Sequence, residues 1–405
     1  MSLRSFDQLA LGQPLQRALR SLGYDTPTPV QAASIPSILA GRDLLGCSQT
    51  GTGKTAAFAL PMLHRLSASK QRSAPNTTRA LVLTPTRELA MQIANSFKAY
   101  GCHLGLKLAM VFGGVSQSPQ IRACNQGLDV LVATPGRLLD LINRDYLRLS
   151  GLAILVLDEA DRMLDMGFLP DIKRLLALIP PKRQTLFFSA TMPPAIAKLA
   201  GSILTNPVKV EAGPSATPVE RIDQRVLFVA QVDKRALLCE VLKDAQTERV
   251  LVFTRTKHGA DRVVQQLVRS EVKAEAIHGD KAQNARQAAL ANFRAGRTRV
   301  LVATDIASRG IDVEGITHVI NYDLPHEPES YVHRIGRTGR AGTDGVAISF
   351  CNSEEKTFLR NIERLIHQAV PVADTRAFGS FKSLPALSAP ALRPARHGRL
   401  PMITA

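Results

Sequence analysis

The sequence predicts an α/β fold of two tandem domains, in which each domain is a mostly parallel sheet with helices on both faces. From Ala80 onward, short apolar runs rich in β-branched residues alternate with helical patterns, as in parallel strands buried on both sides. The same rhythm returns about 170 residues later. At 405 residues, the chain is long enough for two or three domains, each with its own core.

The first domain is expected to contain six such strands, at residues 43–47, 80–84, 108–112, 130–134, 153–157 and 185–188. Ligands of parallel sheets bind beyond the carboxyl ends of the strands. The polar residues that close these runs are therefore expected to face the functional site: residues 84–87, Gly113 and Gly114, residues 134–137, Asp158 and Glu159, and residues 189–191.

A nucleotide-binding loop is predicted at Ser48–Thr55, between the first strand and a helical pattern. Gly51 and Gly53 allow backbone N–H groups to curl around a phosphate, Lys54 can reach the outer phosphates, and the Thr55 hydroxyl can hold Mg²⁺. The phosphate-loop pattern has glycine where this chain has Ser48, and a chance glycine-rich turn is the alternative. An active nucleotide site is still expected, because serine is small.

An internal repeat is indicated by matched stretches in a constant order. Residues 80–84 match 250–254 and residues 130–134 match 300–304, both at an offset of 170, while Gly113 matches Gly279 and Asp158 matches Asp323. A slowly drifting offset is typical of a duplicated domain, although valine-rich strands also recur by chance. The second copy has no phosphate loop, so it is expected to complete the site of the first copy across a cleft.

The domain boundaries follow from composition. Residues 1–213 form the predicted first domain with the nucleotide motifs, and residues 221–370 form the second domain. Residues 214–220 are the predicted linker, because residues 211–220 contain Gly, Pro and Ser. Residues 371–405 are rich in Pro, Ala, Ser and Arg and are expected to be a disordered basic tail. We expect the two domains to move about the linker.

Charge and cysteine content restrict the class of protein. The net charge is +17, with 23 basic against 13 acidic residues before position 214, which favours a polyanionic partner such as nucleic acid. Aromatic residues make up only 5% of the chain, so contacts with a nucleic-acid backbone are expected rather than base stacking. Five scattered cysteines, and no signal peptide or long apolar run, predict a cytoplasmic protein that does not enter a membrane.

Further stretches supply the chemistry that phosphoryl transfer requires. Asp158, after a buried run, can hold the metal, and Glu159 can orient and deprotonate the attacking water; capping of the next helix is the alternative. Gln31 and Tyr24 can read adenine by amide pairing and ring contact, although a capped helix start explains them equally. Residues 333–340 place arginines three positions apart, suited to γ-phosphate oxygens or, alternatively, to RNA.

Together, these stretches resemble the DEAD-box family of ATP-dependent RNA helicases over residues 6–350, and most closely its bacterial RhlE-type branch. The name-giving tetrad is Asp158-Glu159-Ala160-Asp161, and the triplet Ser189-Ala190-Thr191 matches the family's coupling motif. In the second half, residues 283–286, 303–312 and 333–340 are similar to the remaining signatures. The resemblance implies two RecA-like domains and RNA-stimulated ATP hydrolysis coupled to local unwinding of RNA duplexes.

The resemblance also implies roles for individual residues. The catalytic set is Lys54, Asp158, Glu159, Ser189, Thr191, His333 and the arginine fingers Arg337 and Arg340, with Thr55 and Asp158 at Mg²⁺. ATP is expected at Phe6, Tyr24, Thr26, Gln31, Ser48, Gln49, Thr50, Gly51, Thr52, Gly53, Lys54, Thr55, Gly310 and Asp312. RNA is expected at Pro85, Thr86, Arg87, Gly113, Gly114, Thr134, Pro135, Gly136, Arg137, Thr254, Arg255, His278, Gly279 and Thr304.

Three other functions remain open from the sequence. One is an ATP-gated RNA clamp with little strand separation, which needs the same residues. Another is a DNA helicase or translocase, which differs only in the nucleic acid that it binds. The third is a metabolic or transport ATPase, which would leave the basic charge of the first half unexplained. We expect sequence-independent contacts to single-stranded RNA and short duplexes, a monomer, and partners in ribosome assembly or RNA decay. The basic tail either tethers RNA or only keeps the chain soluble.

Overall fold

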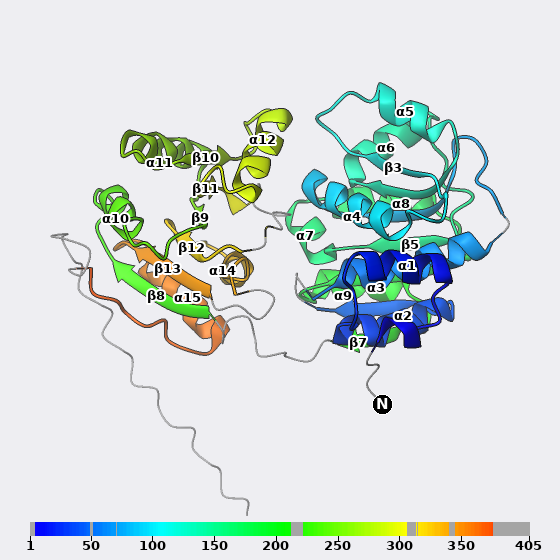
Figure 1. Ribbon diagram of the computed structural model, residues 1–405, viewed down its shortest axis with the longest axis horizontal. Helices are drawn as coiled ribbons and strands as arrows, with labels where there is room; N and C mark the ends of the chain where they lie inside the picture. The colour runs from blue at the N-terminus through cyan, green and yellow to red at the C-terminus, as the bar shows by residue number, and fades with distance from the viewer. Residues whose placement is uncertain are drawn as a thin grey trace, which may run out of the picture.

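The computed structural model describes residues 5–48, 52–69, 71–211, 222–305, 313, 315–339 and 345–375. These residues form two α/β domains that lie beside each other (Figure 1), and each domain is built on its own sheet. The last strand of the first domain ends at Glu211, and the first strand of the second begins at Ile222. The predicted fold class is confirmed.

The first sheet has the strand order β3-β4-β2-β5-β6-β1-β7 within the described residues, and every pairing is parallel. Each of the six strand predictions falls on a strand. The bounds are β1 (Leu44–Cys47), β2 (Thr78–Leu83), β3 (Leu108–Val111), β4 (Leu128–Ala133), β5 (Ile154–Leu157), β6 (Gln184–Ser189) and β7 (Val208–Glu211).

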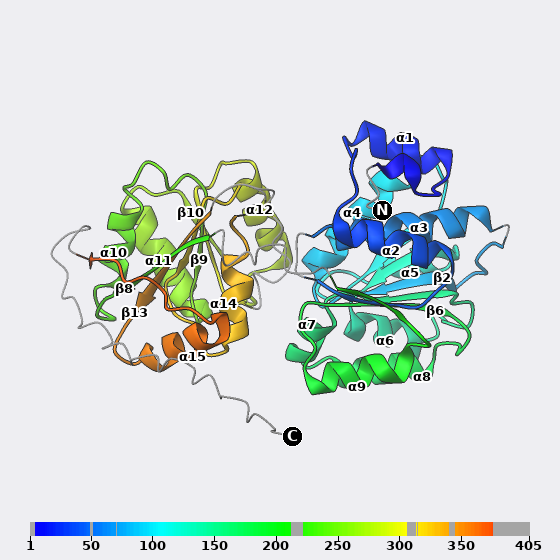
Figure 2. The ribbon, with the colours of Figure 1, turned by 90° about the horizontal axis from the view of Figure 1, so that it is seen from below.

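Two apolar layers cover the faces of this sheet, because successive side chains of a strand point to opposite sides. Phe188 packs with Phe58 under the layer of α1 (Gln13–Ser21), α2 (Pro29–Leu39), α3 (Lys54–Ala68) and α4 (Arg87–Tyr100). Its neighbour Phe187 belongs to the opposite layer, which is covered by α5 (Ser118–Cys124), α6 (Pro135–Asn143), α7 (Ala160–Asp165), α8 (Leu169–Ala177) and α9 (Pro194–Ile203). Figure 2 shows the sheet between these two layers.

The second sheet repeats the order of the first. Its described strands run β10-β11-β9-β12-β13-β8, all parallel, so β9 and β11 occupy the positions that β2 and β4 hold in the first sheet. These are the strands that match at an offset of 170, and the predicted repeat is confirmed. The bounds are β8 (Ile222–Phe228), β9 (Val250–Phe253), β10 (Ala274–Ile277), β11 (Val300–Ala303), β12 (His318–Asn321) and β13 (Gly345–Cys351).

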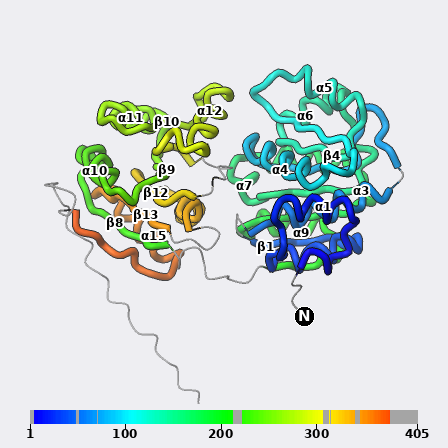
Figure 3. The backbone as a smooth tube through the Cα atoms, viewed as in Figure 1, coloured from blue at the N-terminus to red at the C-terminus, as the bar shows by residue number. Residues whose placement is uncertain are grey.

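The described helices of the second domain are α10 (Lys234–Val241), α11 (Lys257–Arg269), α12 (Gln283–Arg294), α14 (Pro328–Ile335) and α15 (Lys356–Ile366). Figure 3 follows the backbone through both domains. After α15 the chain returns to β8, where the Ala373 amide donates to the Val226 carbonyl and Val226 N–H to Pro371 O, both at 2.9 Å. The described chain therefore stays against the second sheet beyond position 370.

Candidate nucleotide and RNA site

The phosphate loop lies between β1 and α3, at the carboxyl end of the first sheet. Gly53 is the N-cap of α3 and has φ +87°, a left-handed conformation that favours glycine. The buried Lys54 ammonium donates to the Ser48 carbonyl at 2.6 Å, which keeps the cation inside the loop. Gln49, Thr50 and Gly51 lie outside the described residues.

The side chain of Gln31 is hydrogen-bonded to the phosphate loop. Its side-chain oxygen accepts from the Thr28 amide at 2.9 Å, and its Nε2 donates to the Gly53 carbonyl at 3.2 Å. A Cβ atom on Gly53 would stand only 2.4 Å from Gln31 Nε2. The helix cap that was the alternative interpretation of Gln31 is present, since Thr28 and Gln31 form a capping box. The same side chain thus caps α2 and contacts the phosphate loop.

Gly53→Ala is expected to weaken ATP binding by about tenfold or more, since a left-handed non-glycine residue costs roughly 1–2 kcal/mol before the contact with Gln31 is added. Titration with a fluorescent ATP analogue measures this. Gly105→Ala is the matched control, because Gly105 also has positive φ but has no atom within 4 Å of its added Cβ. Equal losses in the two variants would show that strain alone, and not the loop, is responsible.

The remaining residues of the predicted adenine-reading segment lie nearby. Tyr24 packs edge-on against Phe6 and Tyr100, with ring centroids 6.2 and 5.9 Å away. Its hydroxyl lies 3.3 Å from that of Tyr100, and 37% of the residue is exposed. Thr26 is exposed in the turn before α2. Tyr24 is held in place while part of its surface remains accessible.

Asp158 follows β5 and is almost completely buried. Burial raises the pKa of its carboxyl above the ordinary range, with Lys54 opposing the shift. Its Oδ1 has no hydrogen-bond partner within the described residues. A buried carboxylate oxygen without a donor fits a cation, so Asp158 and the Thr55 hydroxyl are suited to hold Mg²⁺. No group of three or more His, Cys, Asp or Glu side chains with metal-binding geometry occurs among the residues the structure describes.

Glu159 is held in a strained conformation, and the charges of three cationic side chains act on it. Its φ of +53° and ψ of 53° place it in the left-handed region, which is rare outside glycine and concentrates at functional sites. Arg162 Nη1 donates to its Oε2 at 2.5 Å. Burial alone would raise the pKa of Glu159, but Arg162, Lys54 and Arg337 lower it, so this carboxylate is ionised at neutral pH. An ionised carboxylate can accept a proton from water.

Asp161 connects the acidic tetrad to the segment after β6. Its Oδ2 accepts from Thr191 N at 2.8 Å and from Thr191 Oγ1 at 2.9 Å, while Ser189 Oγ accepts from the Asp161 amide at 3.2 Å. Burial would raise the pKa of Asp161, but the Thr191 hydrogen bonds hold it below its usual value. Ser189 and Thr191 therefore both contact the tetrad; Ser189 is buried, whereas Thr191 is exposed.

Residues of both domains meet at a small cavity of about 10 Å³. Arg162 of α7 lines it from the first domain, and His333 and Arg337 line it from the second. Burial, with a smaller contribution from Arg162, lowers the pKa of His333 to about 4, so its ring is neutral at pH 7. Arg337 is buried and its charge acts on Glu159. Arg340, Gly310 and Asp312 lie outside the described residues.

Arg334, three positions before Arg337, has a different environment. Its guanidinium forms two bonds to Asp305, at 2.6 and 2.7 Å, and donates to the Asp323 carbonyl at 2.7 Å. It also lies over the Phe253 ring, 5.0 Å from its centroid. These contacts hold Arg334 inside the second domain, so the loop presents Arg337 to the first domain.

The predicted RNA residues of the first domain gather at the carboxyl ends of β2, β3 and β4. Thr86 caps α4, and the next residue, Arg87, lies so close to Gly114 that a Cβ there would be 1.9 Å from its Nη1. Arg137 Nη1 donates to the Val115 carbonyl at 3.2 Å. The N-cap Thr134 and the first-turn residues Pro135 and Gly136 begin α6, and Gly113 and Pro85 complete this group.

In the second domain, the predicted RNA residues follow β9, β10 and β11. Thr254 and His278 are buried, His278 Nε2 lies 3.1 Å from Asp261 Oδ1, and Gly279 and Thr304 follow on neighbouring strands. Arg255 donates to Glu355 Oε1 at 2.7 Å, and the other oxygen of Glu355 accepts from the buried Lys234. The guanidinium of Arg255 is therefore oriented by an ion pair, and 37% of its side chain is exposed.

The domains are joined on this side by a contact between α4 and α12. Arg286 Nη2 lies 2.6 Å from Glu88 Oε1, with both side chains largely buried. Arg87 Nη1 donates to Gln283 Oε1 at 3.2 Å. Residues 283–286 match a family signature in the sequence, but the sequence alone gives them no role. Their partners lie about 195 positions away, so only the assembled structure identifies the pair.

Arg286→Ala is expected to weaken RNA binding about tenfold in the presence of a non-hydrolysable ATP analogue, because it leaves Glu88 buried without its ion partner. RNA affinity without nucleotide should change little, since the pair joins the two domains. Fluorescence anisotropy of a labelled RNA measures both affinities. Arg294→Ala, at the exposed end of the same helix, is the control. An equal loss with and without nucleotide would contradict a role in closure.

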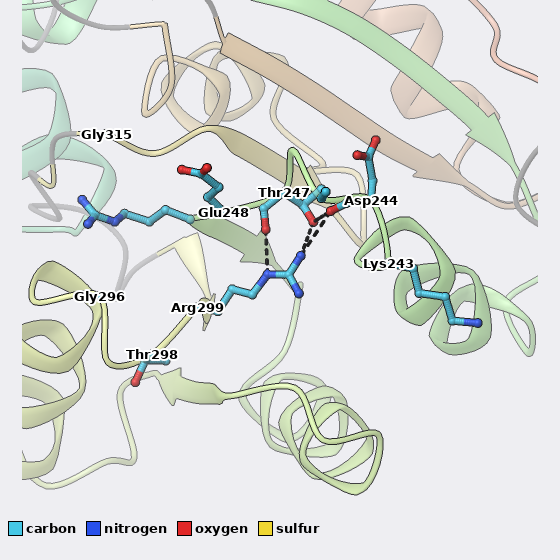
Figure 4. Close-up of a pocket in the computed structure, with 10 residues that line it drawn as sticks. Lys243, Asp244, Thr247, Glu248, Gly296, Thr298, Arg299 and Gly315 are labelled. Carbon is cyan, nitrogen blue, oxygen red and sulfur yellow. Dashed lines mark hydrogen bonds between the residues drawn. The ribbon is translucent and has the colours of Figure 1, made fainter.

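A second cavity, of about 760 Å³, lies at the amino ends of β9 and β11, opposite the site. Arg299 occupies one wall, and Figure 4 shows its guanidinium bonded to the turn after α10. It donates at 2.7 Å to each of the carbonyls of Thr247 and Leu242. These contacts fix the end of α10, so we assign Arg299 a structural role.

Two family models match the chain: DEAD/DEAH box helicase over residues 28–199, and helicase conserved C-terminal domain over residues 233–342. The chain is 42% identical over 362 residues to the DEAD-box ATP-dependent RNA helicase CshA of Bacillus cereus, covering 89% of this chain and 68% of that protein. It is 44% identical over 373 residues to the ATP-dependent RNA helicase DeaD of Mycobacterium tuberculosis, covering 92% and 65%.

Solved structures agree. The structure of S. cerevisiae Dbp5 bound to RNA and ADP BeF3 is 31% identical with a TM-score of 0.81, covering 92% of this chain and 96% of Dbp5. Mss116p bound to ssRNA and AMP-PNP is 26% identical with a TM-score of 0.83, covering 92% and 80%. Both sheets of the chain thus have the RecA-like architecture. The chain belongs to the DEAD-box family of ATP-dependent RNA helicases.

Proposed function

We propose that this helicase hydrolyses ATP at a site completed by its second domain, and that RNA favours the closed arrangement that completes it. The observation that carries the proposal is the meeting of Arg337 and His333 of the second domain with Glu159 and Arg162 of the first. ATP and RNA would each bind across both domains, so each would strengthen the binding of the other. Hydrolysis would then release the RNA.

The residue roles follow from charge and position. Lys54 neutralises phosphate charge, and Glu159 orients the attacking water and accepts its proton. Arg337, with Arg340, stabilises negative charge that develops on the γ-phosphate. Thr55 and Asp158 would hold Mg²⁺, which when bound neutralises charge on the phosphate oxygens. By the family resemblance, Gly310 and Asp312, which lie outside the described residues, would approach the ribose, and Phe6, Tyr24, Thr26 and Gln31 would select adenine.

RNA is proposed to lie along the carboxyl ends of both sheets, on the backbone amides, hydroxyls and guanidinium groups described above. Such contacts carry little sequence information and favour ribose through its 2′-hydroxyl. The start of α6, at Pro135, would crowd a straight duplex, so closure bends one strand and releases the other. The basic tail would add sequence-independent affinity that falls as salt rises.

Several finer assignments belong to the same proposal. The run at residues 158–168, with residues 183–192, supports placement in the RhlE-type branch. A cytoplasmic monomer that acts on structured RNA in ribosome assembly or RNA decay fits the basic charge and the scattered cysteines. No described helix combines the length and the hydrophobicity required to span a bilayer. The domain limits 1–213 and 221–370 are those proposed from composition.

The test compares RNA with DNA of the same sequence on the full-length chain. We expect single-stranded RNA to stimulate ATP hydrolysis and the matched DNA not to, because the proposed contacts use the 2′-hydroxyl. A strand-displacement assay on a short RNA duplex runs beside it. Equal stimulation by both nucleic acids would contradict RNA selectivity. Stimulated hydrolysis without displacement would identify an ATP-gated clamp in place of an unwinding enzyme.

A further inference from the structure

A groove lies on the first domain, outside the site described above. Helices α8 and α9 lie on the same side of the first sheet (Figure 2), and residues of both line a groove with a volume of about 630 Å³. Its lining is mainly aliphatic and includes Leu169, Leu176, Ile179, Ala195, Leu199 and Ile203. Aliphatic side chains left open between two helices are the usual floor of a groove that accepts an amphipathic helix.

The rim of this groove is basic. Lys173 of α8, Lys198 of α9 and Arg183 are the charged residues in its lining, and no acidic side chain lines it within the described residues. Both lysines are exposed, and neither forms an ion pair with a described residue. Arg183 donates to the Pro180 carbonyl at 2.8 Å, while its buried Nε has no hydrogen-bond partner in the described part of the chain. The groove thus combines an apolar floor with three cations.

The apolar floor and the basic rim of the groove together restrict which kind of molecule can bind in it. A segment that fits must place apolar side chains on the floor and acidic side chains at the rim. The chain's own tail has the wrong charge, since residues 376–405 contain five basic residues and no acidic ones. RNA has the right charge, but its phosphate and ribose backbone, which this chain is expected to contact, has no apolar surface with which to bury the aliphatic floor. We infer that the groove between α8 and α9 docks an acidic amphipathic helix of a partner protein.

The position of the groove determines what docking does to the enzyme. Arg183 precedes β6, whereas Ser189, which contacts the acidic tetrad, closes the same strand. Six residues of extended strand separate the two by about 20 Å. A helix at the Arg183 end of the groove therefore leaves the nucleotide and RNA surfaces open, whereas Ala195, which also lines the groove, lies only four residues after Thr191. Docking would locate this helicase on a partner without blocking hydrolysis, which goes beyond the function proposed above.

The experiment uses the full-length chain and a fluorescein-labelled peptide of about five helical turns, roughly 18 residues. The peptide has leucines on one face and glutamates on both flanks, and its scrambled form is the negative probe. Fluorescence anisotropy is expected to show saturable binding that weakens as salt rises. Lys173→Glu with Lys198→Glu, and separately Ala195→Trp to fill the floor, should each weaken binding at least about tenfold.

Arg174→Glu is the matched control, because Arg174 lies on the same helix, is exposed and does not line the groove. All three variants should keep the RNA-stimulated ATPase rate of the wild type within about twofold, which reports intact folding. Equal binding of the scrambled peptide, no saturable binding up to about 1 mM, or unchanged binding by both groove variants would overturn the inference. Weaker binding of a labelled oligo(U) RNA by the lysine variant, with peptide binding unchanged, would instead make the groove an RNA surface.

Discussion

Arg337→Ala is expected to lower the RNA-stimulated rate of ATP hydrolysis by about 10³-fold or more, the range that arginine fingers contribute in related phosphoryl transfers. Arg337 is buried at the junction of the domains, and its charge lowers the pKa of Glu159. Its positive charge acts most strongly when negative charge develops on the transferred phosphate. ATP binding should fall much less than turnover, because Lys54 and the phosphate loop are unchanged.

Single-turnover hydrolysis and titration with a fluorescent ATP analogue separate these two effects. Arg360→Ala is the control, since Arg360 is an exposed arginine on α15 of the same domain. A second comparison is Arg334→Ala, which removes the ion pair with Asp305 and is expected to lower the melting temperature of the domain. Hydrolysis by the Arg337 variant within tenfold of wild type would show that this arginine is not a finger.

Glu159→Gln is expected to reduce the hydrolysis rate by about 10² to 10⁴-fold, which is the usual contribution of a positioned general base. Glutamine keeps the size of the side chain but cannot accept a proton from water. Because the phosphate loop and the RNA residues are intact, RNA should stay bound for longer in the presence of ATP. Rapid-quench hydrolysis and the dissociation rate of a labelled RNA measure the two results.

Asp165→Asn, at the exposed end of α7, is the matched control for loss of an acidic side chain. Glu159 also pairs with Arg162, so the variant must be checked by thermal unfolding against the wild type. A folded Glu159→Gln enzyme that hydrolyses ATP at the normal rate would remove the general-base role. Normal RNA release together with slow hydrolysis would show that release of RNA does not depend on ATP hydrolysis.

The fold could be predicted because its strands are buried on both faces. Residues 130–133 and 300–303 are uninterrupted apolar runs, and their match reflects equivalent positions in the two sheets. The phosphate loop is equally visible, since Gly53 and Lys54 are adjacent in the chain. Features formed by residues that are adjacent in the chain, or that recur at a fixed spacing, can be recognised in the amino-acid sequence itself.

Pairings between distant residues could not be predicted in this way. Residue type and spacing do not distinguish Arg334 from Arg337. In the structure, Arg334 forms an ion pair with Asp305, whereas the charge of Arg337 acts on Glu159. Likewise, the partner of Arg286 is Glu88, in the other domain. Charge and spacing indicate that arginines are needed, whereas the packed structure shows that Arg334 is held by Asp305 and that Arg337 acts on Glu159 of the first domain.

The double attachment of Gln31 has a consequence for how the enzyme discriminates among nucleotides. A side-chain amide has four hydrogen-bonding positions, and within the described residues Gln31 uses one for Thr28 and one for Gly53. If Gln31 reads adenine as proposed, the remaining two positions would contact the base, and one side chain would both recognise the base and hold the phosphate loop. A mismatched purine that displaces this amide would misalign the triphosphate, and fidelity would appear in the speed of the chemical step more than in occupancy.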